Sequence, residues 1–100
     1  MSSNERIIVQ VDPDLKEFIP EFLKNRRDDV AGLRDAVARA EWETVRRIGH
    51  RLRGSGGGYG FDPITDLGAQ LEAATEPPDA ALVRTLIDDL ATYLERVVVV

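Results

Sequence analysis

Apolar residues recur every three or four positions in three stretches of the chain, which is the spacing of one face of an α-helix. The first stretch begins at Pro20 and runs for roughly twenty residues, and the last follows Pro78. Each stretch predicts an amphipathic helix that must bury one face against a partner. The apolar positions are Phe22, Leu23, Val30, Leu33, Val37 and Ala40, then Ile64, Leu67, Leu71 and Ala74, and finally Leu82, Leu86, Leu90, Tyr93, Leu94 and Val97.

Two Asp-Pro pairs indicate where further helices begin. In Asp12-Pro13 and Asp62-Pro63 the aspartate is a favourable N-cap. Proline suits the first helical position, because an N–H there would have no partner within the helix. The first pair predicts a short helix over residues 13–18. Another helix must carry residues 42 to about 60.

Short connections between these helices favour antiparallel neighbours, so the sequence predicts an all-α fold: an antiparallel four-helix bundle over residues 13–97, with the short extra helix at its N-terminal end. Residues 1–11 form a tail or a short strand. β-Branched runs lie at Ile7-Ile8-Val9-Gln10-Val11 and at Val97–Val100. These runs could pair as two short strands, which would cover an otherwise exposed apolar tail.

The composition fits one domain over residues 1–100. The chain is 43% hydrophobic and 31% charged, which supplies one ordinary core and argues against disorder. It has no cysteine and a single histidine, so disulfides, thiol nucleophiles and zinc sites built from several cysteines or histidines are excluded. We expect no cofactor and no bound metal.

Nothing in the sequence indicates a membrane segment or a secretion signal. The longest apolar run, Val97–Val100, is far shorter than the roughly 18 residues that span a bilayer, and residues 1–4 do not open a signal peptide. We expect a cytoplasmic protein, a monomer, with no membrane partner. The net charge of −5 also argues against nucleic acid and anionic lipid as partners.

The single histidine, His50, lies on the polar side of the helix predicted over residues 42–60. At about 100° per residue, the apolar side chains of that helix lie within about 40° of the opposite pole. We therefore expect the imidazole to be exposed to solvent in the middle of a helix. The side chains expected to be buried opposite it are Val45, Ile48, Leu52 and Tyr59.

Arginines and glycines surround His50. Four arginines fall within eight residues that hold no acid: Arg46, Arg47, Arg51 and Arg53. On the helical wheel, the glycines that share the face of His50 are Gly54, one turn later, and Gly57 and Gly58, two turns later.

Glycine costs roughly 0.5–1 kcal/mol relative to alanine inside a helix, so this cluster needs an explanation. One interpretation ends the helix at Gly54 and makes the rest a flexible loop. Against it, Leu52, Gly56 and Tyr59 continue the inward phase, which favours a helix that passes through the cluster. Such a helix would present bare backbone beside His50 and let another protein approach the imidazole closely.

Nucleotide-binding motifs are absent. Gly49 and Gly54 have the spacing of a Walker A motif, but Ser55 and Gly56 stand where lysine and a hydroxyl residue are required, and no G-x-G-x-x-G frame is complete. Residues 53–60 also resemble a short Arg/Gly RNA-binding tract. The chain is acidic, however, and Tyr59 is expected to point inward, which argues against that interpretation.

A fixed spacing of residues starts at the histidine: an apolar residue at +2, a cation at +3, glycine at +4, a small residue next, and glycine at +10. His50, Leu52, Arg53, Gly54, Ser55 and Gly60 fill these positions in order, and Leu67 and the pair Leu71-Glu72 follow. This pattern resembles the histidine-containing phosphotransfer (HPt) domain of two-component phosphorelays. Two features differ from the usual pattern, namely arginine where lysine is commonest at +3, and three consecutive glycines at 56–58.

The resemblance implies a phosphoryl carrier. His50 would accept a phosphoryl group from a response-regulator receiver domain or a hybrid histidine kinase and pass it to another receiver. A neutral imidazole can attack phosphorus without a separate base, and Arg53 can offer its guanidinium to the phosphoryl oxygens. Mg²⁺ would be bound by the partner receiver domain. The expected docking surface comprises Arg46, Arg47, Gly54, Gly57 and Gly58.

The alternative is a non-catalytic helical module that uses this basic, glycine-rich face only to hold a protein partner, with His50 incidental. The two hypotheses differ in one observable. A phosphoryl carrier acquires an acid-labile, alkali-stable phosphate on His50 when it is incubated with a phosphorylated receiver domain, whereas an interaction module does not.

Overall fold

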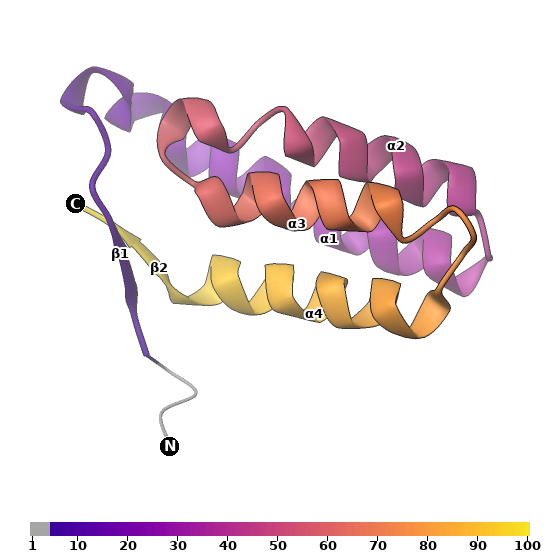
Figure 1. Ribbon diagram of the computed structural model, residues 1–100. Helices are drawn as coiled ribbons and strands as arrows, with labels where there is room; N and C mark the ends of the chain where they lie inside the picture. Colours follow the sequence, from indigo (N-terminus) through magenta and orange to yellow (C-terminus); the bar gives the residue numbers. More distant parts are fainter. Residues whose placement is uncertain (1–4) are drawn as a thin grey trace.

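The computed structural model describes residues 5–100, in which four long helices lie side by side and a small sheet closes one end (Figure 1). The four long helices are α1 (Ile19–Ala38), α2 (Trp42–Arg53), α3 (Asp62–Ala73) and α4 (Ala80–Arg96). Two short 3-10 helices, η1 (Pro13–Phe18) and η2 (Gly57–Tyr59), precede α1 and α3. Each helix packs against its neighbour in sequence, and α4 returns to α1, which closes the bundle. The predicted all-α four-helix bundle is confirmed.

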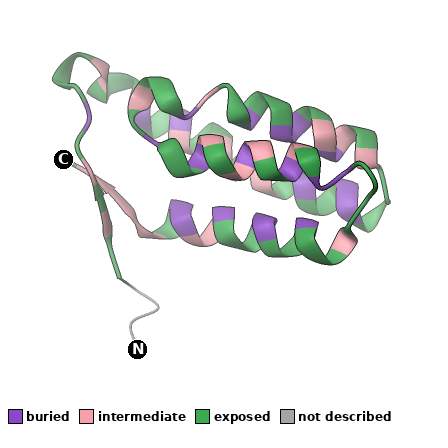
Figure 2. Ribbon diagram, viewed as in Figure 1, coloured by how far each residue is buried: buried purple, intermediate pink, exposed green. Residues whose placement is uncertain are grey.

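The apolar stripes of the helices meet in one core between them (Figure 2). Leu33, Leu71 and Leu90 are fully buried there, as the helical spacing predicts. Two residues assigned to the stripes are exposed. Leu82 is 44% exposed because the buried stripe of α4 is centred on Val83 and Leu86, so Leu82 lies at the edge of this stripe in the first turn. Ala40 is exposed because it follows the end of α1.

Local hydrogen bonds fix the helix starts. The Asp12 side chain accepts from the Asp14 backbone N–H at 2.9 Å, so Asp12 is the N-cap of η1 as predicted. The prediction for Asp62 is wrong by one position. Phe61 is the N-cap of α3, its carbonyl accepts from the Ile64 N–H at 3.0 Å, and Asp62 is the first residue of the helix.

A Schellman motif ends α1. The N–H of Glu41 donates to the carbonyl of Ala36 at 2.8 Å, and that of Ala40 donates to Val37 at 3.0 Å. Ala40 has a φ of 54°, the left-handed conformation that glycine ordinarily provides at this position. This tight turn places α2 antiparallel to α1 after only three linking residues.

The two ends of the described chain pair as strands. β1 (Ile7–Val9) runs parallel to β2 (Val97–Val99), with Ile7 opposite Val97, and Val100 continues the ladder by donating to the carbonyl of Val9 at 3.0 Å. The predicted pairing of the β-branched runs is therefore confirmed. Ile7, Val9, Val97 and Val99 pack against the core. Within residues 5–100, no helix combines the length and the apolar character needed to cross a membrane.

Candidate functional site

His50 lies in the last turn of α2 rather than in the middle of a longer helix. α2 ends at Arg53 and Gly54 is its C-cap, so the prediction of a helix through residue 60 is wrong. The chain then turns through Ser55, whose backbone N–H and hydroxyl both donate to the carbonyl of Leu52 at 3.0 Å. These bonds satisfy an orphan carbonyl at the helix end and stop the helix without a further turn.

Glycine explains the path that follows α2. A Cβ on Gly56 would lie 2.5 Å from the Phe61 carbonyl oxygen and 2.9 Å from Thr65 Oγ1, so this buried residue must be glycine for the loop to pack on α3. Gly60 has a φ of 90°, which reverses the chain into α3. The glycines therefore form a tight turn with a short 3-10 helix.

This turn changes the predicted glycine face. Gly54 still occupies a helical conformation one turn after His50, and a Cβ there would make only ordinary contacts, 3.7 Å at the nearest. Gly57 and Gly58 belong to η2, after the helix has ended, so their wheel positions beside His50 are wrong. Both are exposed, and a Cβ on Gly58 would meet nothing within 4 Å.

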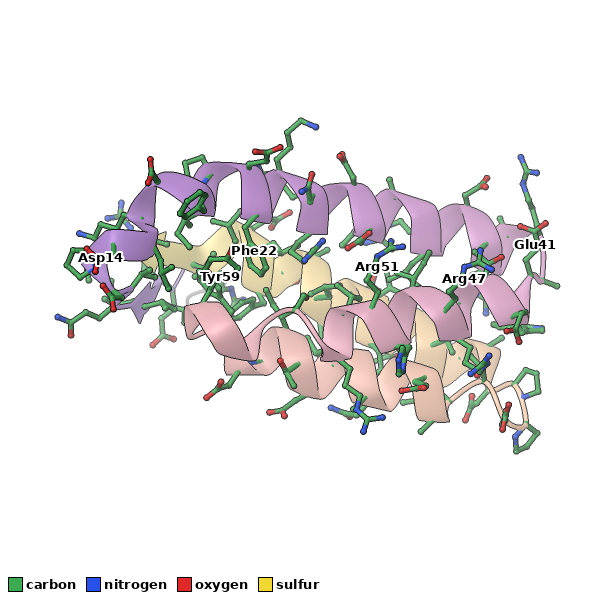
Figure 3. The ribbon with its side chains drawn as sticks, turned by 90° about the horizontal axis from the view of Figure 1, so that it is seen from above. Asp14, Phe22, Glu41, Arg47, Arg51 and Tyr59 are labelled. Carbon is green, nitrogen blue, oxygen red and sulfur yellow. The ribbon has the colours of Figure 1, made fainter. Side chains whose placement is uncertain are left out.

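The predicted orientation of His50 is confirmed. Its side chain is 69% exposed, while Val45, Ile48 and Leu52 are buried on the opposite side of α2. The prediction for Tyr59 is wrong, because this residue lies in η2 after α2 has ended and is only half-buried. Its ring lies 4.7 Å from that of Phe22 in α1 (Figure 3).

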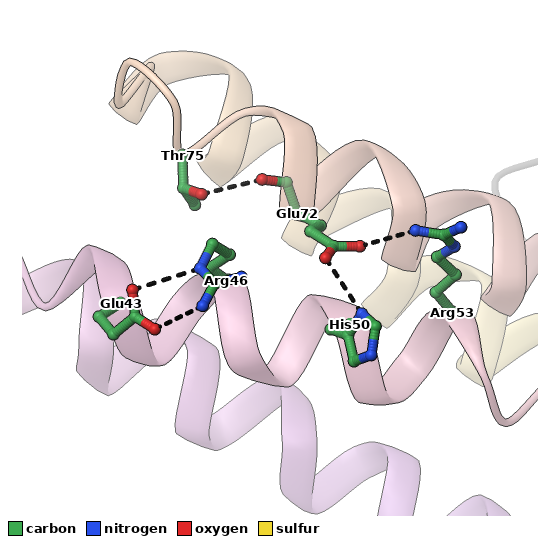
Figure 4. Close-up of polar contacts among 6 residues, drawn as sticks. All are labelled: Glu43, Arg46, His50, Arg53, Glu72 and Thr75. Atoms are coloured by element: carbon green, nitrogen blue, oxygen red, sulfur yellow. Dashed lines mark hydrogen bonds and ion pairs between the residues drawn. The ribbon is translucent and has the colours of Figure 1, made fainter.

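Glu72 of α3 lies between the two residues predicted to do the chemistry. Its Oε2 is 3.1 Å from Nδ1 of His50, and its Oε1 accepts from Nη1 of Arg53 at 3.2 Å (Figure 4). The Glu72 side chain is only 21% exposed. One carboxylate therefore joins the imidazole and the guanidinium, which are one turn apart on α2.

The charge state of Glu72 follows from these neighbours. Partial desolvation raises the pKa of Glu72, but the hydrogen bonds from Arg53 and His50 outweigh it and hold the pKa below its usual range. The carboxylate is therefore ionised at neutral pH, and an ionised carboxylate only accepts hydrogen bonds.

The four arginines around His50 do not form one basic surface. Arg46 makes a two-pronged contact with Glu43, at 2.7 and 3.2 Å, which lowers the pKa of Glu43. Arg53 bonds Glu72, as described above.

The remaining two arginines differ in their surroundings. Arg51 turns away from His50 toward α1 and donates to Asp29 at 2.6 Å (Figure 3). Arg47 is exposed and has no direct ion pair within residues 5–100, although its charge also lowers the pKa of Glu43. Three of the four arginines thus form ion pairs with carboxylates from outside the eight-residue segment.

A shallow open groove runs between α2 and α3 beside these side chains. It is lined by Arg46, Arg53, Ala69, Glu72, Ala73 and Glu76. The two alanines are the only small side chains that line this groove. Across residues 5–100, no three His, Asp or Glu side chains gather in a way that could hold a metal ion.

The chain matches a known family over most of its length. A model of the Hpt domain matches residues 17–98, which includes all four helices. The chain belongs to the Hpt domain family. Neither the curated proteins nor the solved structures contain a significant match to it. Hpt domains serve phosphotransfer in phosphorelays and interact with receiver domains and kinases.

In this Hpt domain, the sequence pattern predicts no role for Glu72. Glu72 belongs to the pair Leu71-Glu72 of the family pattern, but its contacts with His50 and Arg53 depend on how α3 crosses α2. His50 and Glu72 are 22 residues apart. No spacing rule within one helix predicts that contact.

Proposed function

We propose that this Hpt domain carries a phosphoryl group on Nε2 of His50, between the aspartate of one receiver domain and that of another. The observation that carries the proposal is the contact of Nδ1 with the Glu72 carboxylate on an otherwise exposed ring. That contact orients the imidazole and separates the roles of its two nitrogens.

The carboxylate of Glu72 determines the tautomer of the His50 ring. Because the ionised carboxylate of Glu72 only accepts, Nδ1 must carry the proton that lies between them. The lone pair of the neutral ring is then on Nε2, which has no hydrogen-bond partner among residues 5–100. Nε2 is the nitrogen available to attack phosphorus.

The transfer step balances without any added base. The Nε2 lone pair forms the N–P bond, and the bond between phosphorus and the aspartate oxygen of the donor breaks, with its electron pair leaving on that carboxylate. The ring keeps its Nδ1 proton and becomes a cation, which the negative charge of Glu72 stabilises. Transfer to the next receiver aspartate reverses these bond changes and returns the neutral imidazole.

In this proposal, the guanidinium of Arg53 donates hydrogen bonds to the phosphoryl oxygens. A guanidinium has five N–H donors, and Nη1 bonds Glu72 while the side chain remains 57% exposed. The other donors can reach a group on the adjacent imidazole, one turn away on the same helix. Arg53 would thus stabilise charge on the transferring group and, through Glu72, the ring that carries it.

The proposed docking surface for the receiver is the exposed side of α2 with the groove between α2 and α3. Gly54 has no side chain, so no group protrudes next to His50 on that side. Arg46 and Arg47 flank His50 on the preceding turn. The acidic pocket of the receiver would bring Mg²⁺ and meet the arginines of this side. Gly57 and Gly58, in the exposed η2 turn, would border the same surface.

Transfer from a purified phosphorylated receiver domain tests this function. The wild-type chain should acquire an acid-labile, alkali-stable phosphate, and His50→Gln should acquire none while melting at nearly the same temperature, because the exposed ring contributes little to the core. Labelling of the His50→Gln variant would refute the assignment. A wild-type chain that binds receivers but never becomes labelled would instead support the non-catalytic module.

A further inference from the structure

Helices α2 and α3 touch through their backbones next to the site. A Cβ on Gly68 of α3 would overlap the backbone nitrogen of Arg53 and would lie 2.7 Å from the carbonyl oxygen of Gly49. From the other side, a Cβ on Gly49 would lie 2.9 Å from the backbone nitrogen of Glu72. Real Cβ atoms essentially never approach heavy atoms so closely, so both positions require glycine at this crossing.

The crossing lies directly beneath the functional side chains. Glu72 is one turn after Gly68 on the same face of α3, and Gly49 immediately precedes His50 on α2. Arg53 is one turn after Gly49 and contributes the backbone nitrogen that Gly68 touches. The three residues of the proposed site therefore take their relative positions from one backbone contact.

We propose that the contact between Gly49 and Gly68 is a positioning device, which holds α3 close enough to α2 for the Glu72 carboxylate to bond Nδ1 of His50. This inference rests on the proposed function of His50. Gly49 and Gly68 are positioning residues, because they touch neither the phosphoryl group nor the reacting nitrogen and act only through Glu72.

The hydrogen bond between His50 and Glu72 tolerates little separation of α2 from α3. Ordinary contacts of a Cβ begin at about 3.4 Å, so an alanine at 68 forces the two backbones apart by on the order of 1 Å. The bond between His50 and Glu72 is 3.1 Å long, and N–H···O bonds extend to about 3.2 Å. A separation of that size exceeds what this hydrogen bond tolerates.

The test reads the tautomer of His50 directly by ¹⁵N NMR of the ring nitrogens in the unphosphorylated, folded chain. In the wild type we expect the proton on Nδ1, and in Glu72→Ala we expect the ring to populate both tautomers. Gly68→Ala should shift the tautomer in the same direction as Glu72→Ala, and the double variant should shift it no further than Glu72→Ala alone.

Two further variants make the result decisive. Gly49→Ala meets milder contacts, 2.9 to 3.1 Å, and should shift the tautomer in the same direction by a smaller amount, which covers the case that Gly68→Ala does not fold. Gly32→Ala is the matched control, since its Cβ would lie an ordinary 3.5 Å from Ile48 on the opposite side of α2. It should leave the tautomer unchanged.

A folded Gly68→Ala or Gly49→Ala chain that keeps the wild-type tautomer would overturn the positioning role. That outcome is distinct from failure of the proposed function, because the tautomer is measured without phosphate or a partner. If the wild type never accepts a phosphoryl group, the function fails, whatever the glycine variants do to the ring.

Discussion

Oε2 of Glu72 lies 3.1 Å from Nδ1 of His50, a contact between residues 22 positions apart that joins α3 to the last turn of α2. It assigns opposite roles to the two nitrogens of an exposed ring. Because the carboxylate faces Nδ1, Nε2 is the nitrogen that the proposed function offers to a receiver domain. The proposed site therefore draws side chains from two helices, although its proposed nucleophile lies on one.

The ionisation of Glu72 should respond to its two partners. Its pKa lies below the ordinary glutamate value of about 4.3, so the ionised form stabilises the folded chain above that pH, and this contribution is lost as the pH falls through the lowered pKa. A ¹³C NMR titration of the carboxyl group measures the pKa, which should rise toward the ordinary value in Arg53→Ala. A wild-type midpoint at or above about 4.3 would contradict the assigned contacts.

Replacing Arg53 should slow transfer without preventing it. Loss of one charge-assisted bond to the phosphoryl group at an exposed site should reduce the transfer rate about tenfold, which corresponds to about 1.4 kcal/mol in the barrier. Rapid-quench kinetics with a phosphorylated receiver measure the rate of Arg53→Ala, and Arg53→Lys should retain most of the wild-type rate. Arg34→Ala, which removes an exposed ion pair with Asp88 on α4, is the control. Equal rates for Arg53→Ala and the control would make Arg53 an ordinary surface residue.

Asp29 should be important for stability. It is buried, receives a 2.6 Å hydrogen bond from Arg51, and lies 2.9 Å from Nε of the nearly buried Arg26, in an ion pair not aligned as a hydrogen bond. Asp29→Ala leaves Arg26 without a counter-charge and should cost about 3 kcal/mol, the lower end of the range for broken buried pairs, because Arg51 can turn to solvent.

Urea unfolding measures this loss, and the neighbouring residue offers a matched control. Asp28 makes an exposed pair with Lys24, so Asp28→Ala should cost only about 0.5 kcal/mol or less. Similar losses of unfolding free energy for the two alanine variants would show that burial does not make Asp29 more important for stability than Asp28.

The Schellman turn after α1 predicts a stabilising substitution. Ala40 adopts a φ of 54°, where glycine carries no Cβ penalty. Ala40→Gly should therefore stabilise the fold by about 1 kcal/mol and raise the melting temperature by about 4–8 °C. Ala31→Gly, at an exposed position inside α1, should instead destabilise by about 1 kcal/mol. A lower melting temperature for Ala40→Gly would contradict the assigned backbone conformation.

The apolar periodicity predicted the features that depend on a single helix. It placed the helices, and it put His50 opposite Val45 and Leu52, because the apolar stripe fixes which side faces solvent. It failed at the end of α2. The inward phase of Gly56 and Tyr59 is real, but it arises in a turn that packs on α3, and a helical wheel does not distinguish that turn from a continuing helix.

The apolar pattern of the sequence could not predict contacts between helices. The bond between Arg51 and Asp29, and the approach of Gly68 to Gly49, depend on how far apart the helix axes lie and at what angle they cross. The eight-residue segment from Arg46 to Arg53 holds no acid, yet folding brings Asp29 and Glu72 to its arginines. A local count of charge therefore overstated how basic this side of the molecule is.

The position of the phosphoryl group on the imidazole ring is the most direct test of the roles proposed for His50 and Glu72. The chain is labelled with ¹⁵N, phosphorylated by a receiver domain, and examined by NMR for scalar coupling between phosphorus and each nitrogen of His50. We predict coupling to Nε2, with Nδ1 still protonated and facing Glu72. Phosphorus bonded to Nδ1, or a chain that carries no phosphohistidine after exposure to phosphorylated receivers, would rule out these roles.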